Sequence, residues 1–241
     1  MKVLNDLLWD GELKIFQDTE KFKFSIDSIL LANFVILNKR VTRILDIGTG
    51  NAPIPLMLTK RIPAKIDGVE IQKESFELAE ESVKYNNLDN QINLIYGDIK
   101  ELYKLMENNS YDTIVSNPPY FKSNTKVPIN EGKRLARNEQ TLSIKDIFII
   151  AKKLLKDGGN IAIVIDTERL VEVMELMRQC SIEPKRIQFV YPKNTKNSKI
   201  MLVEGTKNGN PGIKVLNPIY IQDEENNYTE YIENLLNNFG K

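Results

Sequence analysis

The sequence predicts an α/β fold in which a doubly wound, mostly parallel sheet ends in an antiparallel pair of strands. From residue 41 onward, short apolar runs alternate with helical patterns, an order that is typical of parallel βαβ units. Near the end of this alternation, two apolar runs are joined only by residues 192–198, which are too few for a parallel crossover. At 241 residues, the chain is long enough to bury a full core as one domain.

Residues 1–40 predict a short N-terminal extension that packs on the core. Residues 12–17 and 21–24 alternate between polar and apolar side chains, which indicates β-structure. Asp27 is then expected to cap a helix, because a helical spacing of apolar residues follows it.

The core is predicted to span residues 41–207. Its first five strands are expected at short apolar runs over residues 43–47, 65–70, 92–96, 111–116 and 160–165. Helical patterns cover residues 54–61, 73–86, 144–155 and 168–179. Residues 186–191 and 199–204 supply the antiparallel pair. Residues 208–241 form a polar, asparagine-rich tail in which residues 229–239 fit a helix.

The composition excludes several classes of site. The chain has no histidine, which removes Ser-His and Cys-His catalysis and most zinc sites, so we expect no metal. Its one cysteine, Cys180, cannot form an intramolecular disulfide and is expected to be a small buried side chain. The sequence shows no signal pattern and no apolar run of membrane-spanning length, which predicts a cytoplasmic protein without a membrane partner. Basic and acidic residues balance at 33 each, so net charge does not indicate a nucleic-acid partner.

A stiff polar tetrapeptide, Asn117-Pro118-Pro119-Tyr120, directly follows the fourth core strand. Proline has no N–H for a strand ladder, so the strand must end there, at the edge where open α/β sheets bind ligands. The asparagine offers amide donors and an acceptor, and the tyrosine offers a flat stacking face. We interpret the tetrapeptide as a clamp for a planar amide or amine nitrogen. The alternative is a strand that simply ends at proline.

Five residues at the ends of the first three strands predict an adenosine-type pocket. Gly48 and Gly50 allow a tight turn that brings the backbone close to a ligand. Asp46, Glu70 and Asp98 close three successive strands. Glu70 lies 20 positions after Gly50, where an acid typically binds ribose hydroxyls, and Asp98 is placed to accept from an adenine amine. A lone acid at such a position is more often a cap or a solvated turn residue.

In this order, the glycine pair, the strand-end acids and the tetrapeptide resemble the class I S-adenosylmethionine-dependent methyltransferases, over residues 41–204. In that family, the tetrapeptide marks enzymes that methylate amino groups. The resemblance is closer still to the tRNA1(Val) adenine-37 N6-methyltransferase group, through residues 24–32 and 134–139, although Asn138 stands where a histidine is expected. The resemblance implies a Rossmann-like, seven-stranded mixed sheet, S-adenosylmethionine as cofactor and tRNA as partner.

The resemblance also implies roles for individual residues. The cofactor would be held by Asp46, Gly48, Gly50, Glu70, Asp98 and Asn117. The Asn117 side-chain oxygen and the Pro118 carbonyl would accept the two N–H bonds of an adenine N6 amine, which frees its lone pair for attack. Pro119 completes the catalytic tetrapeptide with Tyr120, which would stack on the base with help from Phe121. The attack requires no strong base, in keeping with a chain that lacks histidine.

Two basic runs are candidates for contacts with RNA. One run flanks the clamp and the other joins the last two strands; the candidates are Lys133, Arg134, Arg137, Lys193, Lys196 and Lys199. Each run alone is explained equally well by ordinary solvated loop charges. A base in an anticodon loop is single-stranded, and such bases can be splayed out for chemistry.

Three rival functions remain open from the sequence. A protein-glutamine N5-methyltransferase would carry a similar clamp, but the roughly 40 residues before the core are too few for that family's helical N-terminal domain. An rRNA guanine N2-methyltransferase is a second enzymatic rival. An RNA-binding cofactor sensor without activity is the third, although the intact clamp and pocket acids argue against such decay. We expect a monomer or a weak dimer.

Overall fold

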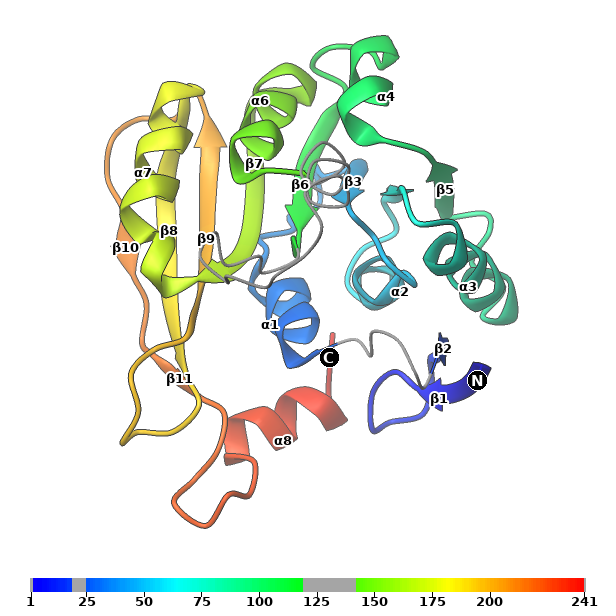
Figure 1. The fold of residues 1–241 in the computed structure, drawn as a ribbon, viewed down its shortest axis with the longest axis vertical. Helices are drawn as coiled ribbons and strands as arrows, with labels where there is room; N and C mark the ends of the chain where they lie inside the picture. Colours follow the sequence, from blue (N-terminus) through cyan, green and yellow to red (C-terminus); the bar gives the residue numbers. More distant parts are fainter. Residues whose placement is uncertain (1, 19–24, 119–141, 241) are drawn as a thin grey trace, which may run out of the picture.

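The computed structural model describes residues 2–18, 25–118 and 142–240, which centre on one twisted sheet between two layers of helices (Figure 1). The described strands of this sheet are β3 (Arg43–Ile47), β4 (Lys65–Glu70), β5 (Ile92–Tyr96), β6 (Tyr111–Ser116), β7 (Leu155–Asp166), β8 (Ile182–Tyr191), β9 (Ile200–Lys207), β10 (Lys214–Val215) and β11 (Ile219–Tyr220). Their order across the sheet is β10-β8-β9-β7-β6-β3-β4-β5, and β11 also pairs with β8.

The directions of the strands confirm the predicted fold class. β9 is antiparallel to both of its neighbours, β7 and β8, whereas the other neighbouring pairs that the structure describes in this sheet are parallel. The seven main strands, β3 to β9, therefore form the mixed, doubly wound sheet with an antiparallel last pair. The two-residue strands β10 and β11 were not predicted, because pairing with the edge of β8, rather than a local pattern, creates them.

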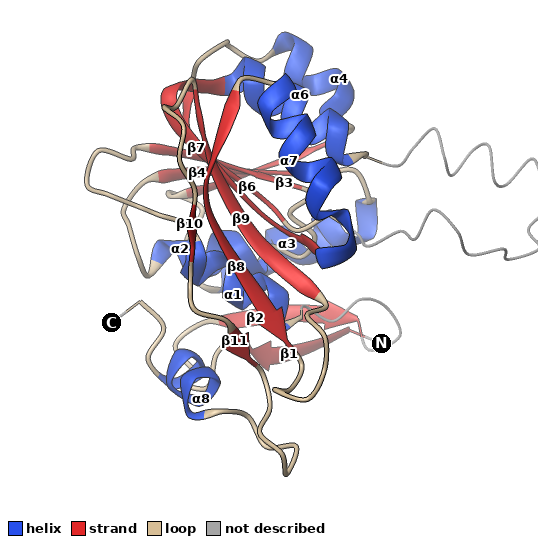
Figure 2. Ribbon diagram, turned by 90° about the vertical axis from the view of Figure 1, so that its left-hand side faces the viewer, coloured by secondary structure: helices blue, strands red, loops and turns tan. Residues whose placement is uncertain are grey.

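Helices cover both faces of the sheet, so its central strands are buried on both sides and have continuous apolar runs (Figure 2). Along β3, Ile44 packs in one core and Leu45 in the other. The first core includes α1 (Ile26–Phe34), α2 (Pro53–Thr59) and α3 (Lys73–Tyr85). The second includes α4 (Ile99–Leu105), α6 (Ile144–Leu154) and α7 (Leu170–Gln179). Within the described ranges, none of the helices is both long and apolar enough to cross a membrane.

An N-terminal hairpin and a C-terminal helix pack against the first layer of helices. The hairpin pairs β1 (Lys2–Asp6) with β2 (Lys14–Asp18), and the C-terminal helix is α8 (Glu230–Asn237). The Ser82 hydroxyl on α3 accepts from the Phe16 N–H at 2.9 Å. The Trp9 N–H donates to the Leu236 carbonyl at 3.1 Å, so the hairpin loop is tied to α8.

Some predicted boundaries were wrong. Asp27 does not cap α1, because that helix begins at Ile26 after Ser25, and Asp27 lies in its first turn. β7 begins at Leu155, directly after α6, and not at residue 160. α4 was missed because its apolar face is weak: Leu105 is 88% exposed. The predicted β-structure at residues 21–24 lies outside the described residues.

Candidate active site

The turn after β3 is held in place by the end of β4. The N–H groups of Gly48 and Thr49 both donate to the Val69 carbonyl, each at 3.0 Å. Gly48 and Gly50 have φ angles of 75° and 60°, in the left-handed region that favours glycine. A side-chain carbon added at either glycine would meet no heavy atom of the described residues within 4 Å. The turn therefore presents bare backbone to open space, as a close ligand contact requires.

Glu70 closes β4 beside this turn. Its Oε2 atom accepts from the Gly50 N–H at 2.8 Å, and its Oε1 atom accepts from the Gln72 N–H at 2.7 Å. The residue is only 5% exposed. Burial raises the pKa of Glu70, although the backbone N–H groups that it binds oppose the shift. The structure thus joins the predicted strand-end acid directly to the predicted glycine turn.

Asp46 is fully buried beneath the same turn. Its Oδ2 atom accepts from the Thr49 hydroxyl at 2.7 Å, and Oδ1 has no hydrogen-bond partner among the described residues. Burial raises the pKa of Asp46 to about 7; the Thr49 hydroxyl opposes this rise, and the nearby charge of Glu70 adds to it. A buried carboxylate oxygen without a partner, under an open turn, is a group that a polar ligand or a bound water can satisfy.

Asn117 directly follows β6, and the sheet brings it to the glycine turn. β6 pairs with β3 so that Val115 lies opposite Asp46. One residue further along, the Ser116 hydroxyl donates to the Ile47 carbonyl at 2.8 Å. Asn117, the first residue of the predicted clamp, therefore lies beside the carboxyl end of β3. Pro118 is also described, and it is buried.

The Asn117 amide contacts a residue that sequence reasoning missed. Its Nδ2 atom donates to the hydroxyl of Ser28, on α1, at 3.0 Å. Ser28 lies in the segment 24–32 that carried part of the family resemblance, but no local pattern indicated a contact with a residue so far along the chain. Ile71, which directly follows Glu70, is 41% exposed in the structure although its side chain is apolar.

Asp98 lies at the same edge of the sheet but serves as a helix cap. The Gly97 N–H donates to the Glu70 carbonyl at 2.9 Å, which places the end of β5 beside the end of β4. The Asp98 Oδ1 atom accepts from the Lys100 N–H at 2.8 Å and so caps α4. Contact between this carboxylate and an adenine amine stays a prediction.

The remaining predicted site residues divide into two sets. The first set lies outside the described residues: Pro119, Tyr120, Phe121, Lys133, Arg134 and Arg137. The second set is the basic loop, residues 192–199, between β8 and β9. Because β8 runs parallel to β6 and β7, this loop lies at the same edge of the sheet as Asn117. The Thr167 N–H, after β7, donates to the Lys199 carbonyl at 2.9 Å.

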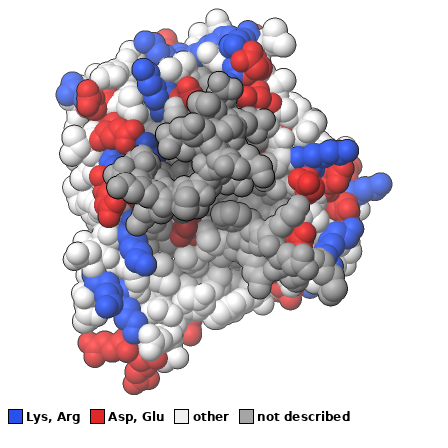
Figure 3. Space-filling model, viewed as in Figure 1, with Lys and Arg blue, Asp and Glu red and all other residues white. Residues whose placement is uncertain are grey.

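The basic loop does not form a uniform positive surface. Lys196 and Lys199 are exposed, but the Lys193 ammonium donates to the Glu224 carbonyl at 3.2 Å. An acidic turn, residues 223–225, therefore lies against the loop. On the face shown in Figure 3, the basic and acidic side chains of the described residues are interspersed. The sequence did not indicate this neighbourhood, because 31 residues separate Lys193 from Glu224.

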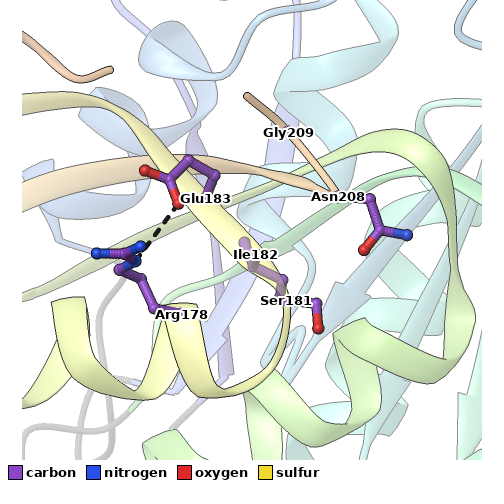
Figure 4. Close-up of a pocket in the computed structure, with 6 residues that line it drawn as sticks. All are labelled: Arg178, Ser181, Ile182, Glu183, Asn208 and Gly209. Atoms are coloured by element: carbon purple, nitrogen blue, oxygen red, sulfur yellow. Dashed lines mark ion pairs between the residues drawn. The ribbon is translucent and has the colours of Figure 1, made fainter. Parts of the chain in front are cut away.

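A separate hollow lies at the opposite edge of the sheet, where β8 begins and β9 ends (Figure 4). It encloses about 350 Å³ and is lined by Arg178, Ser181, Ile182, Glu183, Asn208 and Gly209. Its two charged side chains pair with each other, with 3.5 Å between Arg178 Nε and Glu183 Oε2. No predicted site residue lines it. Among the described residues, no group of three His, Cys, Asp or Glu side chains is placed to hold a metal ion.

Comparison with known families and sequences gives a consistent result. The profile of the methyltransferase small domain family matches residues 23–190. The chain is similar to the tRNA1(Val) (adenine(37)-N6)-methyltransferase of Parabacteroides distasonis, with 35% identity over 190 residues and 79% of each chain covered. It is also similar to the enzyme of the same name from Trichodesmium erythraeum, with 30% identity over 231 residues and 95% of each chain covered.

Comparison with solved structures supports the fold. The chain resembles the crystal structure of a predicted O-methyltransferase, protein Atu636 from Agrobacterium tumefaciens, with a TM-score of 0.70. The match covers 89% of this chain and 96% of the other, at 17% sequence identity. A likeness at this identity establishes the shared doubly wound architecture.

Proposed function

The chain belongs to the methyltransferase small domain family, and from that premise we propose that it methylates the exocyclic N6 of an adenine in tRNA. The proposed target is position 37, in the anticodon loop of a valine tRNA. The enzyme is an S-adenosylmethionine-dependent methyltransferase. The observation that carries the choice of acceptor is the position of Asn117, at the end of β6 and beside the glycine turn after β3.

The residues at the carboxyl edge fit S-adenosylmethionine. The open glycine turn supplies bare backbone, and the buried Oδ1 atom of Asp46 is an acceptor without a partner among the described residues. The strand-end carboxylate of Glu70 is the proposed partner of the ribose hydroxyls. The exposed apolar side chain of Ile71, directly after Glu70, suits the face of an adenine ring. When bound, the cofactor supplies a methyl group activated by its sulfonium. Asp98 is the proposed acceptor for the amine of its adenine.

The clamp would act on the acceptor amine. An exocyclic adenine nitrogen is a poor nucleophile, because its lone pair is delocalised into the ring. The Asn117 Oδ1 atom and the Pro118 carbonyl accept its two N–H bonds, which draws the nitrogen towards tetrahedral geometry and localises the lone pair. Tyr120 and Phe121 stack on the base. The new N–C bond would replace the S–C bond to the methyl group, and the nitrogen, then cationic and acidic, would release its surplus proton to water, so no side chain has to act as a strong base. The protein's contribution is orientation and desolvation of the amine.

The RNA part of the proposal rests on the basic loop and the similar enzymes. Lys196 and Lys199 are exposed on the loop at the same edge as Asn117, within reach of a phosphate backbone that enters the site from that side. Two enzymes named for tRNA1(Val) adenine-37 resemble this chain over 79% and 95% of its length. Lys133, Arg134 and Arg137, close in sequence to the clamp, are proposed to contact the same RNA.

The test is methyl transfer to synthetic anticodon stem-loops. We expect label from S-adenosylmethionine to enter a stem-loop with adenine at position 37 and to appear as N6-methyladenosine in nucleoside mass spectrometry. A stem-loop already methylated at that N6 serves as the matched control and should accept at most about one hundredth as much label. The Asn117→Ala enzyme should lose turnover by at least about a hundredfold, the scale seen for loss of one transition-state hydrogen bond, while its cofactor affinity weakens much less.

Two outcomes would reject this proposal in different ways. Near-normal turnover by a folded Asn117→Ala enzyme would remove the clamp mechanism. The wild-type enzyme could also fail to label either RNA but label a glutamine-containing peptide or guanine in rRNA. That result would show that the methyl acceptor is not an adenine in tRNA. Binding of tRNA without any transfer would leave the non-enzymatic sensor as the better account.

A further inference from the structure

The contact between Ser28 and Asn117 joins two parts of the chain that are 89 residues apart. Ser28 lies in the first turns of α1 and is 4% exposed. Its hydroxyl oxygen accepts from the Asn117 Nδ2 atom at 3.0 Å. The side chain at the start of the clamp is therefore held by a helix that precedes the whole core of the fold.

The chemistry of the clamp makes the orientation of this amide decisive. The two ends of an asparagine amide have similar size but opposite hydrogen-bonding character, because Oδ1 accepts and Nδ2 donates. An acceptor amine presents N–H groups, so Nδ2 in place of Oδ1 would set donor against donor. Since the amide is planar, a hydrogen bond that holds Nδ2 towards α1 turns Oδ1 away from α1.

We propose that Ser28 is a positioning residue for methyl transfer, which holds the Asn117 amide with Oδ1 directed at the acceptor amine. The inference rests on the proposed function, since it requires an N–H acceptor group in the clamp. Ser28 does not touch the reacting atoms. It acts only through Asn117, so its removal should affect the chemical step and leave cofactor binding unchanged.

The helix that carries Ser28 is anchored well enough for this role. At the C-terminal end of α1, the carbonyls of Ala32 and Val35 accept hydrogen bonds from Arg61, on the loop after α2, the latter at 2.9 Å. Arg186 on β8 donates to the Phe34 carbonyl at 3.1 Å, and its guanidinium lies 4.4 Å from the centre of the Phe34 ring. Two arginines thus fix the last turn of α1 to the core. A fixed helix can hold a catalytic amide with little freedom to rotate.

The test compares Ser28→Ala with Ser82→Ala. Ser82 is a matched control, because it is also a buried helical serine whose hydroxyl accepts a hydrogen bond, from the Phe16 N–H at 2.9 Å, but it lies away from the clamp. We expect Ser28→Ala to lower kcat about tenfold on the adenine stem-loop, with KM for S-adenosylmethionine unchanged, while Ser82→Ala keeps the wild-type kcat. Ser28→Cys replaces the hydroxyl by a poor acceptor of similar shape. Ser28→Cys should show the same loss of kcat, and it provides the test if Ser28→Ala does not fold.

A double variant separates positioning from a general structural effect. If Ser28 acts only through Asn117, then Ser28→Ala should lower the residual rate of an Asn117→Ala enzyme by less than about twofold, measured with excess enzyme over long incubations. Equal kcat values for Ser28→Ala and Ser82→Ala would overturn the inference while the proposed function stands. So would a full tenfold loss in the Asn117→Ala background. Absence of transfer by the wild-type enzyme would reject the proposed function and this inference together.

Discussion

Buried acids at the two edges of the same sheet differ in how many hydrogen bonds they accept from the rest of the fold. Near the amino edge, Asp67 on β4 accepts four hydrogen bonds. Its Oδ2 atom accepts from the Tyr111 hydroxyl at 2.6 Å and twice from the Arg43 guanidinium, and its Oδ1 atom accepts from the Asn93 amide at 2.8 Å. At the carboxyl edge, Asp46 on β3 accepts only from Thr49, and its second oxygen has no partner among the described residues.

A second pair of acids shows the same contrast. Asp112, near the start of β6, binds Lys156 and the backbone and hydroxyl of Thr42. Burial works to raise the pKa of Asp112, but the hydrogen bonds outweigh it and the pKa is lowered. Within the described part of the chain, Glu70, at the end of β4, accepts only from backbone N–H groups, and burial raises its pKa.

The difference separates stability from function within one sheet. A carboxylate whose oxygens are all bound to side chains of the fold has nothing left to offer a ligand, and it stabilises the native state. A carboxylate that is buried with few partners costs free energy in the absence of ligand, and a polar ligand recovers part of that cost. We therefore expect the acids at the amino edge to matter for stability and not for ligand binding. The acids at the carboxyl edge are expected to matter more for ligand binding than for stability.

The comparison predicts its largest effect at Glu70. Glu70→Ala should weaken S-adenosylmethionine binding by at least about tenfold, because each charge-assisted hydrogen bond to the ribose contributes roughly 1.5–3 kcal/mol. The free energy of unfolding should fall by less than in the Asp67 variant below: the Gly50 and Gln72 N–H groups lose their acceptor, but burial already penalises the charge of Glu70. Calorimetric titration gives the affinity and chemical denaturation the stability. Unchanged affinity would place the ribose elsewhere.

Asp67→Ala is the reciprocal change at the amino edge. It leaves the buried Tyr111 hydroxyl and the Asn93 amide without their partner, so we expect a loss of about 2–4 kcal/mol in the free energy of unfolding. Cofactor affinity, measured at a temperature where the variant is folded, should match wild type. A large loss of affinity at normal stability would break the division between the edges.

Asp46→Asn tests the comparison through pH. The pKa of Asp46 is raised from 3.8 to about 7 in the folded state, so the native protein binds the proton more tightly than the unfolded chain does. Its stabilising contribution is therefore present below about pH 4 and is lost as pH rises to about 7. Between pH 5 and pH 8, the cofactor-free wild type should lose roughly 2 kcal/mol relative to Asp46→Asn, which cannot ionise. Parallel pH profiles in denaturation experiments would show that Asp46 does not titrate in this range.

The smallest expected effect concerns RNA at the carboxyl edge. Replacing the three basic-loop lysines by alanine should flatten the salt dependence of tRNA binding, by about 0.7–0.9 in log–log slope for each phosphate that the loop no longer neutralises. The replaced residues are Lys193, Lys196 and Lys199. Filter binding across a salt series measures the slope.

A matched triple variant at the amino edge supplies the control for that experiment. It replaces the same number of basic residues, the exposed Lys39, Arg40 and Lys65, by alanine. This control should keep the wild-type slope and the wild-type affinity for tRNA. Equal slopes for both triple variants would remove the basic loop from the RNA surface.

The sequence predicted the central strands almost to the residue, because they are buried on both faces and their apolar runs end at turns. The bounds of β3, β4, β5 and β6 were predicted as the structure has them. The errors lie where a local pattern does not decide the outcome. β10 and β11 exist only through pairing with β8, and β7 begins directly after α6 rather than at residue 160.

The closeness of candidate residues that end a strand was predictable, since strand order alone gathers those ends at one edge. Asp46, Glu70 and the glycine turn were found in this way and are joined in the structure. The Ser28 contact with Asn117 was not predictable, because it depends on how α1 packs against the sheet. The acidic turn beside Lys193 was missed for the same reason.

The hydrogen bond between the Trp9 N–H and the Leu236 carbonyl bears on the order in which the protein forms. During synthesis, the hairpin of β1 and β2 leaves the ribosome before the core and α8 do. The loop of the hairpin therefore cannot complete its packing until the core and α8 have also been made. Contacts of such long sequence separation form slowly, because loop-closure entropy opposes them. The hairpin loop is thus expected to be among the last parts to be protected although it precedes the core in the sequence, and hydrogen exchange during refolding would show the Trp9 amide gaining protection together with α8.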